Sequence, residues 1–312
     1  MISNVREMER DEASGATEAD AIAAYRPLLF AIAYRMLGSV ADAEDAVQDT
    51  WLRWHRALAG GVAIASPKAW LTTTITRRCL DELGSARVRR EQYVGPWLPE
   101  PIVGVGGADP AETVADPDSL SMAFLVLLES LSAKERAVFL LHDVFGYEFT
   151  EIAAIVGESA AYCRQLAKRA RAHVAERRPR FTPAAEERER LAERFLRAVN
   201  DGDLSGLIAT LADDVVVWSD GGGKVNAARK PVAGGPDKVA RYLLNIARLA
   251  APGTAIRRAA VNGEPGLVTT LDGALSGAVT FDVANGSIRA IYIVVNPDKL
   301  HPAPADAAPP VA

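Results

Sequence analysis

The sequence of 312 residues predicts a multidomain protein: two all-α helical modules, the second a helix-turn-helix, followed by an α+β domain. Three observations predict this order. Apolar residues recur at steps of three and four over residues 18–93 and 118–180, which is typical of amphipathic helices. Residues 94–117, rich in proline and glycine, predict a linker between these modules. Strand-like runs separated by Asn-Gly or Asp-Gly pairs then mark residues 184–300, and the tail 301–312 is expected to be disordered.

Three helices account for the first module. The first ends at Gly38, because glycine is the usual residue just beyond a helix C-terminus. The second spans about residues 41–58, and a pair of glycines follows it. Ser66 is a good N-cap and Pro67 suits the first helical position, so a third helix is expected from there to about residue 83.

The second module contains the helix-turn-helix. Its helices are expected over 120–131, 132–145, 150–156 and 159–178, with Ser132 and Glu135 forming a capping box. Gly157 can adopt the positive φ of the tight turn, and the small core of the motif is expected to contain Ile152, Val156, Cys163 and Leu166. The last helix is basic, as in a helix that enters the major groove of DNA, although a solvated surface helix would show the same charges. The residues expected to meet DNA are Ser159, Tyr162, Arg164, Gln165, Lys168, Arg169 and Arg171.

The third domain begins with helices and continues with strands, which indicates an α+β fold. Helices are expected over 186–199, 204–211 and 236–249. Strands, rich in β-branched residues, are expected over 214–220, 255–261, 266–271, 277–283 and 287–295.

Composition excludes several function classes. The chain has no apolar run long enough for a transmembrane helix, and its polar, acidic start does not resemble a secretory signal. Cys79 and Cys163 have no Cys/His cluster around them, which argues against a disulfide framework or a metal site. We therefore expect a cytoplasmic protein without metal or cofactor. The net charge of −5 speaks only weakly against nucleic acid, because local charge matters more than the sum.

Two motifs in the first module carry a family resemblance. DAEDAVQDTWLRWHRAL (42–58) and SPKAWLTTTITRRCLDEL (66–83), followed about 70 residues later by the helix-turn-helix, resemble an extracytoplasmic-function (ECF) sigma factor. The resemblance implies that residues 18–93 bind core RNA polymerase and the promoter −10 element. It implies that residues 118–180 read the −35 element.

The resemblance also assigns roles to individual residues. The polymerase-binding residues would be Asp45, Gln48, Asp49 and Leu52. The −10 contacts would be Lys68, Arg77, Arg78, Arg87, Arg89 and Arg90. Without the resemblance, the acidic face of the helix expected over about residues 41–58 would be interpreted as an ordinary solvent-exposed face, with its carboxylates favoured near the helix N-terminus. Trp70 could stack on a base, but its apolar spacing favours the core. Cys79 and Gly84 stand where the family often has Asn and Arg, which leaves the promoter sequence open.

Three short motifs connect the third domain to the rest. They are Trp97, Leu98, Pro99, Glu100 and Pro101; then Asp220, Gly221, Gly222, Gly223 and Lys224; and finally Asn296, Pro297, Asp298, Lys299 and Leu300. With them the domain resembles the SnoaL-like branch of the NTF2-like superfamily, which implies a cone with a pocket. Taken alone, the motifs could be a stiff spacer, a hairpin turn and a terminal turn. A tryptophan between two domains buries a large apolar area when it packs, which is stabilising. We therefore expect the three motifs to form a regulatory interface.

The predicted function is a sigma factor that directs promoter-specific transcription initiation and is modulated by its own C-terminal domain. Its expected partners are core RNA polymerase, promoter DNA and a small molecule in the C-terminal pocket, and a separate anti-sigma protein is not required. Two alternatives stay open: a stand-alone ligand-responsive helix-turn-helix regulator, and a SnoaL-type enzyme fused to a DNA-binding module. The candidate catalytic carboxylates, Asp213, Asp214, Asp220 and Asp282, show no paired donor in sequence, so the chain is not expected to be an enzyme.

Overall fold

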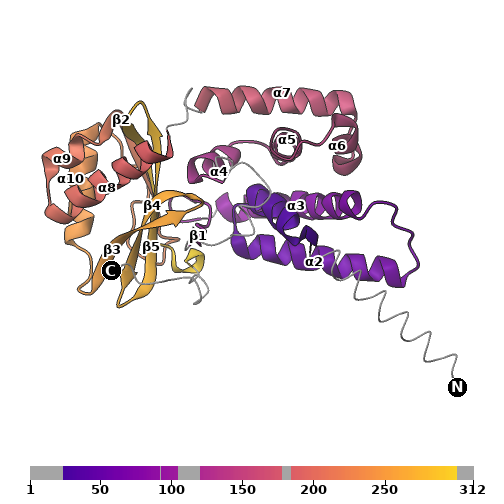
Figure 1. Ribbon diagram of the computed structural model, residues 1–312, viewed down its shortest axis with the longest axis horizontal. Coiled ribbons are helices and arrows are strands. Elements are labelled where there is room, and N and C mark those ends of the chain that lie inside the picture. The colour runs from indigo at the N-terminus through magenta and orange to yellow at the C-terminus, as the bar shows by residue number, and fades with distance from the viewer. Residues whose placement is uncertain (1–23, 92, 105–119, 178–183, 301–312) are drawn as a thin grey trace, which may run out of the picture.

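The computed structural model describes residues 24–91, 93–104, 120–177 and 184–300, with backbone alone for 85–91 and 177. Helices make up one half of the described molecule, and a sheet with its own helices makes up the other (Figure 1). In these residues no helix is both long and apolar enough to cross a membrane.

The first module contains a helix over residues 24–37, α2 (Val40–Ala59) and α3 (Pro67–Glu91). Gly38 ends the first helix with a φ of +68°, and Ser39 then caps α2 by accepting a hydrogen bond of 3.1 Å from the Asp42 amide. Helix α3 is longer than predicted and continues past Gly84. An isolated glycine costs a helix only about 1 kcal/mol, and good helix formers follow it.

The second module consists of α4 (Met122–Leu128), α5 (Ala133–Phe139), a π-helical turn η2 (Leu140–Val144), α6 (Phe149–Val156) and α7 (Ala160–Arg177). The capping box of Ser132 and Glu135 is present. Gly157 has a φ of +72° and separates α6 from α7, as the helix-turn-helix requires. The four predicted core residues of the motif, Ile152, Val156, Cys163 and Leu166, are all buried.

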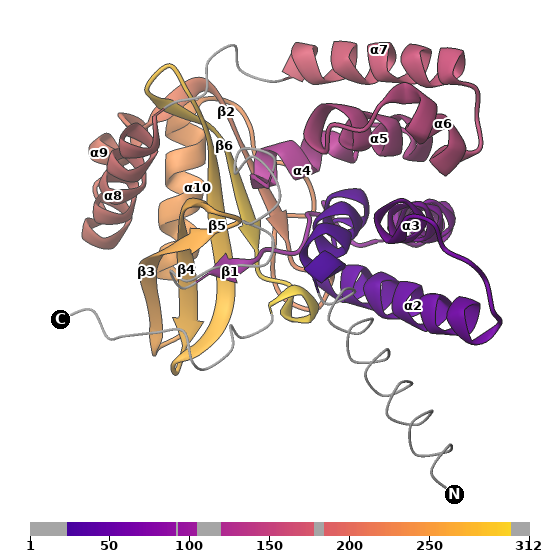
Figure 2. The ribbon, with the colours of Figure 1, turned by 45° about the vertical axis from the view of Figure 1, so that its right-hand side comes forward.

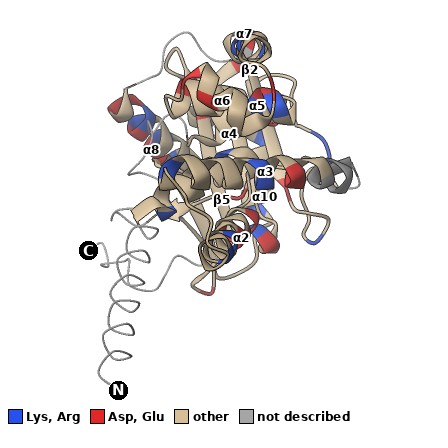
Figure 3. Ribbon diagram, turned by 90° about the vertical axis from the view of Figure 1, so that its right-hand side faces the viewer, with Lys and Arg blue, Asp and Glu red and all other residues tan. Residues whose placement is uncertain are grey.

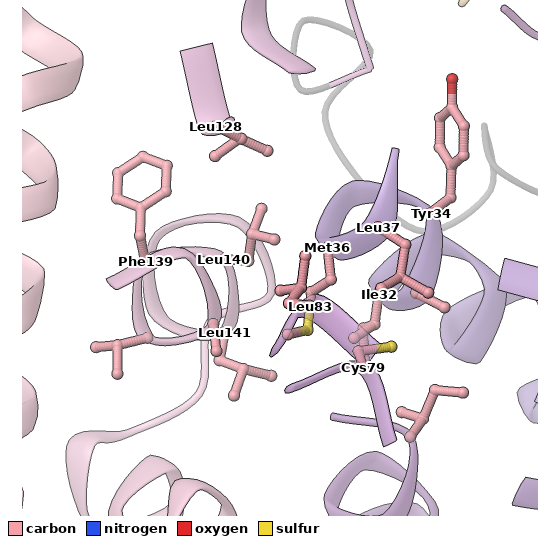
Figure 4. Packing of buried hydrophobic residues seen from close by; sticks show 14 of the residues in the cluster. Ile32, Tyr34, Met36, Leu37, Cys79, Leu83, Leu128, Phe139, Leu140 and Leu141 are labelled. Carbon is pink, nitrogen blue, oxygen red and sulfur yellow. The ribbon is translucent and has the colours of Figure 1, made fainter. Parts of the chain in front are cut away.

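The two helical modules share one hydrophobic core. Met36 and Leu83 from the first module lie close to Leu140 and Leu141 from the second (Figure 4). Helix α3 packs directly on α5 and α6. The guanidinium of the buried Arg136 on α5 donates 2.6 Å to the Met36 carbonyl across the same interface. The modules therefore form a single packed body in this structure.

The third domain is a curved sheet with helices on one face. Its elements are α8 (Ala185–Asp201), α9 (Leu204–Ile208), β2 (Leu211–Asp220), α10 (Pro236–Arg248), β3 (Thr254–Val261), β4 (Glu264–Leu271), β5 (Ala274–Ala284), β6 (Ser287–Val294) and the short η3 (Pro297–Lys299). The strand order is β1-β3-β4-β5-β6-β2, antiparallel except for the parallel pair of β2 and β6. Asn262, Asp272 and Asn285 adopt positive φ in three tight hairpin turns, each followed by glycine.

The linker prediction needs one correction. Val103 and Gly104 form β1, an edge strand that pairs antiparallel with Val261 and Ala260 of β3. A two-residue strand leaves no periodic signal in sequence, because it exists only where the edge of β3 is available to pair with it. Part of the predicted linker is thus built into the sheet of the third domain.

The two faces of the sheet have different partners. Helices α8, α9 and α10 cover one face, and the core there includes Phe195, Leu243 and Phe281. On the other face, Tyr292 of β6 packs with Leu98 of the linker and Met122 of α4. Figure 2 shows α4 next to this side of the sheet. This is the α+β arrangement expected of an NTF2-like domain, and its second face lies against the helical modules.

Candidate functional site

Helix α7 and Ser159, just before it, present the predicted DNA contacts to solvent. All seven, Ser159, Tyr162, Arg164, Gln165, Lys168, Arg169 and Arg171, are exposed. The helix lies at an outer edge of the molecule (Figures 1 and 3). Arg171 pairs with Asp143 at 2.8 Å, and the Arg164 guanidinium lies 5.6 Å from the centre of the Phe149 ring. Neither contact covers the helix, so this basic surface remains accessible.

The predicted −10 residues of α3 have neighbours instead. The Arg77 guanidinium donates 2.9 Å to the Ile155 carbonyl and 2.8 Å to the Ala154 carbonyl, at the C-terminal end of α6. A cation is favoured there, because unpaired carbonyls give that end of a helix partial negative charge. The Lys68 ammonium lies 5.5 Å from the centre of the Tyr147 ring of the second module.

Arg78 is engaged within its own module. It pairs with Glu82 at 2.9 Å and lies 3.5 Å from Asp49, and the hydrogen bond to Glu82 raises the pKa of Arg78. The side chains of Arg87, Arg89 and Arg90 lie outside the described residues. The structure therefore brings Lys68 and Arg77 to the second module and Arg78 to its own acidic neighbours.

Trp70 has two surroundings. It packs edge-on against Trp54, with ring centres 5.4 Å apart, as a core residue would. It also lines a surface hollow of about 570 Å³ together with Ile64, Thr73 and Arg77. The hollow lies beside the loop that precedes α3, where the family resemblance places −10 recognition.

The acidic face of α2 is open. Asp45, Gln48 and Leu52 are exposed and lie three and four residues apart, on one side of the helix. Leu52 is 45% exposed and adds an apolar side chain to this polar face. Asp49 on the same face pairs with Arg53 at 3.0 Å. The four predicted polymerase-binding residues thus form one polar surface that includes the apolar side chain of Leu52.

The three sequence motifs meet at a buried network that we call the clasp, formed by Tyr93, Trp97, Leu98, Asp220, Asn296 and Lys299. Its centre is the Asp220 carboxylate, which is fully buried. It accepts hydrogen bonds from the Leu98 amide at 2.9 Å, the Tyr93 hydroxyl at 2.5 Å and the Lys299 ammonium at 2.8 Å. A buried carboxylate needs such partners, because an unpaired charge in the interior is strongly destabilising.

Lys299 completes the clasp from the end of the chain's last motif. Its ammonium also donates to the Leu98 carbonyl and lies 4.1 Å from the centre of the Trp97 ring. The Asn296 amide donates 2.8 Å to the Tyr93 hydroxyl. Burial and the hydrogen bond to Asp220 raise the pKa of Tyr93, so its hydroxyl stays protonated.

The remaining motif residues surround the clasp. The Gly222 amide donates 3.1 Å to Asp220, and its Cα faces Asn296 so closely that a Cβ would lie 2.5 Å from the Asn296 amide nitrogen. Lys224 and Asp298 form an exposed pair at 2.5 Å, and Pro99 and Pro101 are buried. Leu300 packs at the sheet face that holds Leu98, and Gly221, Gly223 and Pro297 belong to the same two loops.

The linker is also fixed to the first module. The Glu100 carboxylate accepts from the Val40 amide at 2.8 Å and so caps α2, and the Glu100 carbonyl accepts from the Tyr34 hydroxyl at 2.7 Å. Trp97 packs over Gly38, where a Cβ would lie 2.8 Å from the ring. The same linker residues thus touch both the first module and the third domain.

Sequence reasoning missed two members of this interface. Asn262 donates from its side chain to the Tyr34 hydroxyl and to the Leu120 carbonyl, both at 2.9 Å, and accepts from the Ile102 amide at 2.8 Å. It joins both modules and the linker, yet in sequence it is only the first residue of an Asn-Gly turn. Tyr93 lies just before the first motif, and nothing in its spacing marks it.

The candidate catalytic carboxylates do not meet in the cone. Asp213 and Asp214 are exposed, and Asp220 belongs to the clasp on the other face of the sheet. Asp282 is half-buried, and burial raises its pKa, but it does not line the cavity between α8, α10 and the sheet. Among the described residues that line this cavity there is no carboxylate and no histidine.

Comparison with known proteins gives the family. Residues 21–89 match the model of Sigma-70 region 2, and residues 121–174 match that of Sigma-70, region 4. The ECF RNA polymerase sigma factor SigJ of Mycobacterium tuberculosis is 40% identical over 295 residues, covering 90% of this chain and 92% of SigJ. The probable ECF RNA polymerase sigma factor SigI of the same organism is 33% identical and covers 91% of this chain and 94% of SigI.

A solved structure matches over nearly the whole chain. The crystal structure of Mycobacterium tuberculosis SigJ superimposes with a TM-score of 0.73 at 38% identity, covering 91% of this chain and 97% of that one. The matches include the region 2 module as well as the helix-turn-helix, which favours a sigma factor over a stand-alone regulator. The chain belongs to the extracytoplasmic-function family of RNA polymerase sigma factors, which direct promoter-specific transcription initiation.

Proposed function

We propose that the C-terminal domain regulates this sigma factor by holding its two DNA-reading modules together through the clasp. The observation that carries the proposal is the buried pair of Lys299 and Asp220, which fixes the linker between the modules to the third domain. The ammonium and carboxylate hold both the carbonyl and the amide of Leu98. The linker therefore cannot leave the sheet while the clasp is closed.

The closed arrangement is inhibitory. Helices α3 and α6 pack directly on each other, and packed helices have axes about 8–10 Å apart. Promoter elements at −10 and −35 are separated by about 25 base pairs, or about 85 Å of duplex at 3.4 Å per base pair. Modules that share a core cannot reach both elements, so the clasp has to open before initiation.

The residue roles in this proposal are those that the family resemblance implies. The seven predicted contacts, Ser159 and six residues of α7, bind the −35 element, and Asp45, Gln48, Asp49 and Leu52 of α2 bind the polymerase. Lys68, Arg77, Arg78, Arg87, Arg89 and Arg90 contact the −10 region. Turning the Arg77 guanidinium fully toward a DNA phosphate would break its hydrogen bonds to the Ile155 and Ala154 carbonyls, which supports a competition between the closed and the DNA-bound state.

The same arrangement supports control from within the chain, without a separate anti-sigma protein. A partnership with RNA polymerase would place the chain in the cytoplasm. The third domain acts as a regulator and not as a catalyst, because no carboxylate lines its cavity among the described residues. A small molecule in this cavity would then be a signal and not a substrate.

Multi-round transcription with purified core polymerase tests the proposal, on a promoter selected from random DNA. Lys299→Met removes the clasp ammonium but keeps an apolar side chain of similar length. We expect at least a fivefold rise in promoter-specific transcript. The matched control is Lys224→Met, whose pair with Asp298 is exposed and contributes little. Equal or lower activity of a folded Lys299→Met protein would overturn the proposal.

A further inference from the structure

The C-terminal domain encloses a cavity of about 280 Å³ between α8, α10 and the sheet face that these helices cover. Much of its wall is apolar, with Phe195 and Leu243 among the contributors. Ile246 also lines it and is 37% exposed, so the cavity reaches the protein surface. An apolar cavity of about 150 Å³ holds one benzene ring, and about 280 Å³ gives room for about two fused rings.

The polar groups of the wall are neutral. Among the described residues that line the cavity there is no Asp, Glu, Lys, Arg or His. Ser219 and Tyr242 have hydroxyl oxygens 3.4 Å apart, a long hydrogen bond that either group can exchange for one to a ligand. The Asn226 side chain adds an amide. Such a wall disfavours a charged ligand, which would lose its water without gaining a counter-charge.

Neighbouring residues of β2 and β6 connect this cavity to the clasp. Side chains alternate between the two faces of a strand, so Ser219 lines the cavity while Asp220 lies in the clasp. After β6, Val295 lines the cavity and Asn296 lies in the clasp, and both of their amides donate to the Asp220 carbonyl, at 2.8 and 3.0 Å. A shift of this cavity wall moves the clasp with it.

The loop after β2 makes a second connection. Asn226 and Ala227 form cavity wall, and the Ala227 side chain lies so close to Gly221 that a Cβ there would be 2.8 Å away. The next residue, Gly222, donates to Asp220. Because Ala227 and Gly221 are in close contact, a ligand that displaces Asn226 and Ala227 also displaces Gly221 and Gly222, which lie next to the clasp.

We infer that this cavity binds a neutral, mostly apolar molecule of about two rings, and that its binding loosens the clasp and releases the two DNA-reading modules. The effect on transcription rests on the proposed function, whereas the binding itself does not. Binding and loosening are linked reciprocally. If the ligand shifts the opening equilibrium of the clasp by a given factor, opening of the clasp raises the affinity for the ligand by the same factor.

Fluorescence titration of the full chain with 1-naphthylamine, a neutral molecule of two fused rings, tests the binding. We expect saturable binding at one site, and at least tenfold weaker binding of its sulfonated analogue, 5-amino-1-naphthalenesulfonate. Ala247→Trp fills the cavity from α10 and should weaken probe binding at least tenfold. Asn245→Trp, exposed on the same helix, should not. Absent binding, or equal binding by both variants, would overturn the site.

Hydrogen exchange tests the coupling. Saturating probe should speed exchange of the Leu98 amide, which donates to Asp220, at least threefold. Lys299→Met should raise the affinity for the probe by a similar factor. Unchanged exchange and affinity would overturn the coupling. If Lys299→Met left transcription unchanged while Ala247→Trp still blocked the probe, the proposed regulation would fail and the binding site would stand.

Discussion

Two basic helices of this sigma factor, α7 and α3, meet different surroundings. Both are predicted to contact promoter DNA, and both carry several arginines. The predicted contacts on α7 are all exposed, whereas on α3 Arg77 donates to carbonyls of α6 and Lys68 lies over a tyrosine of the second module. The difference indicates that this packed arrangement leaves the predicted −35 contacts accessible and engages predicted −10 contacts with the second module. Regulation would act on the placement of the modules, and not by covering the recognition helix.

The largest expected effect is a loss of stability when the interface between the two helical modules is disrupted. Arg136 is buried, which lowers its pKa to about 10, so it is still charged at neutral pH. It holds the Met36 carbonyl and pairs with Glu129 at 2.7 Å. Arg136→Met removes the ion pair with Glu129 and the hydrogen bond to the Met36 carbonyl, and should lower the free energy of unfolding by about 3 kcal/mol in chemical denaturation.

The control for that prediction is Arg171→Met. Arg171 also pairs with a carboxylate, Asp143, but its side chain is 48% exposed, so the loss should stay below about 1 kcal/mol. Equal losses in the two variants would show that the module interface adds no special stability, and the contrast between α3 and α7 would lose its energetic basis.

A smaller effect comes from one hydrogen bond across the module interface. The hydroxyls of Thr72 on α3 and Tyr147 of the second module lie 2.9 Å apart and are buried. Tyr147→Phe should loosen the closed state by about 1 kcal/mol, since a typical buried hydrogen bond contributes that much. This predicts about a fivefold rise in promoter-specific transcription.

Thr72→Val removes the same bond from the other side and should give a similar rise. Because both substitutions remove one interaction, the double variant should exceed neither single variant by much. Fully additive effects would mean that the two residues act separately, and this bond would not belong to the closing interface.

The smallest expected effect concerns DNA binding by the exposed helix α7. Arg169→Ala on the exposed α7 should weaken binding to −35 duplex and reduce the salt slope by about one unit for the lost phosphate contact. Arg171→Ala should reduce it less, because Arg171 first has to leave Asp143. Arg190→Ala, exposed on α8, is the control, and a slope unchanged by Arg169→Ala would remove this helix from DNA.

Local structure could be predicted from the sequence where the signal itself is local. The capping box at Ser132, the positive φ at Gly157 and the buried positions of the helix-turn-helix each depend on residues within one or two turns. The hairpin turns at Asn-Gly and Asp-Gly pairs are predicted for the same reason. The helix expected over 204–211 ends instead at Ile208, because pairing of β2 with β6 begins at Leu211.

Contacts between domains could not be predicted in this way. Apolar spacing shows which face of a helix is buried, but not that Met36 and Leu141 share one core. Gly38 ends a helix, as expected, yet it also leaves room for the Trp97 ring, which no local rule indicates. Asn262 fits its turn and also joins three parts of the chain through its side chain. The short motifs marked the clasp, but only the fold shows that Asp220 is its centre.

The distance between the two DNA-reading modules tests the central claim most directly. Cysteines introduced at the exposed Arg56 of α2 and His173 of α7 would carry spin labels, since the native Cys79 and Cys163 are buried and react poorly. We predict one narrow, short distance in the full chain and a broader, longer distribution in the same protein with Lys299→Met. Identical distributions in the two proteins would contradict the account, because the clasp would then not be what holds the modules together.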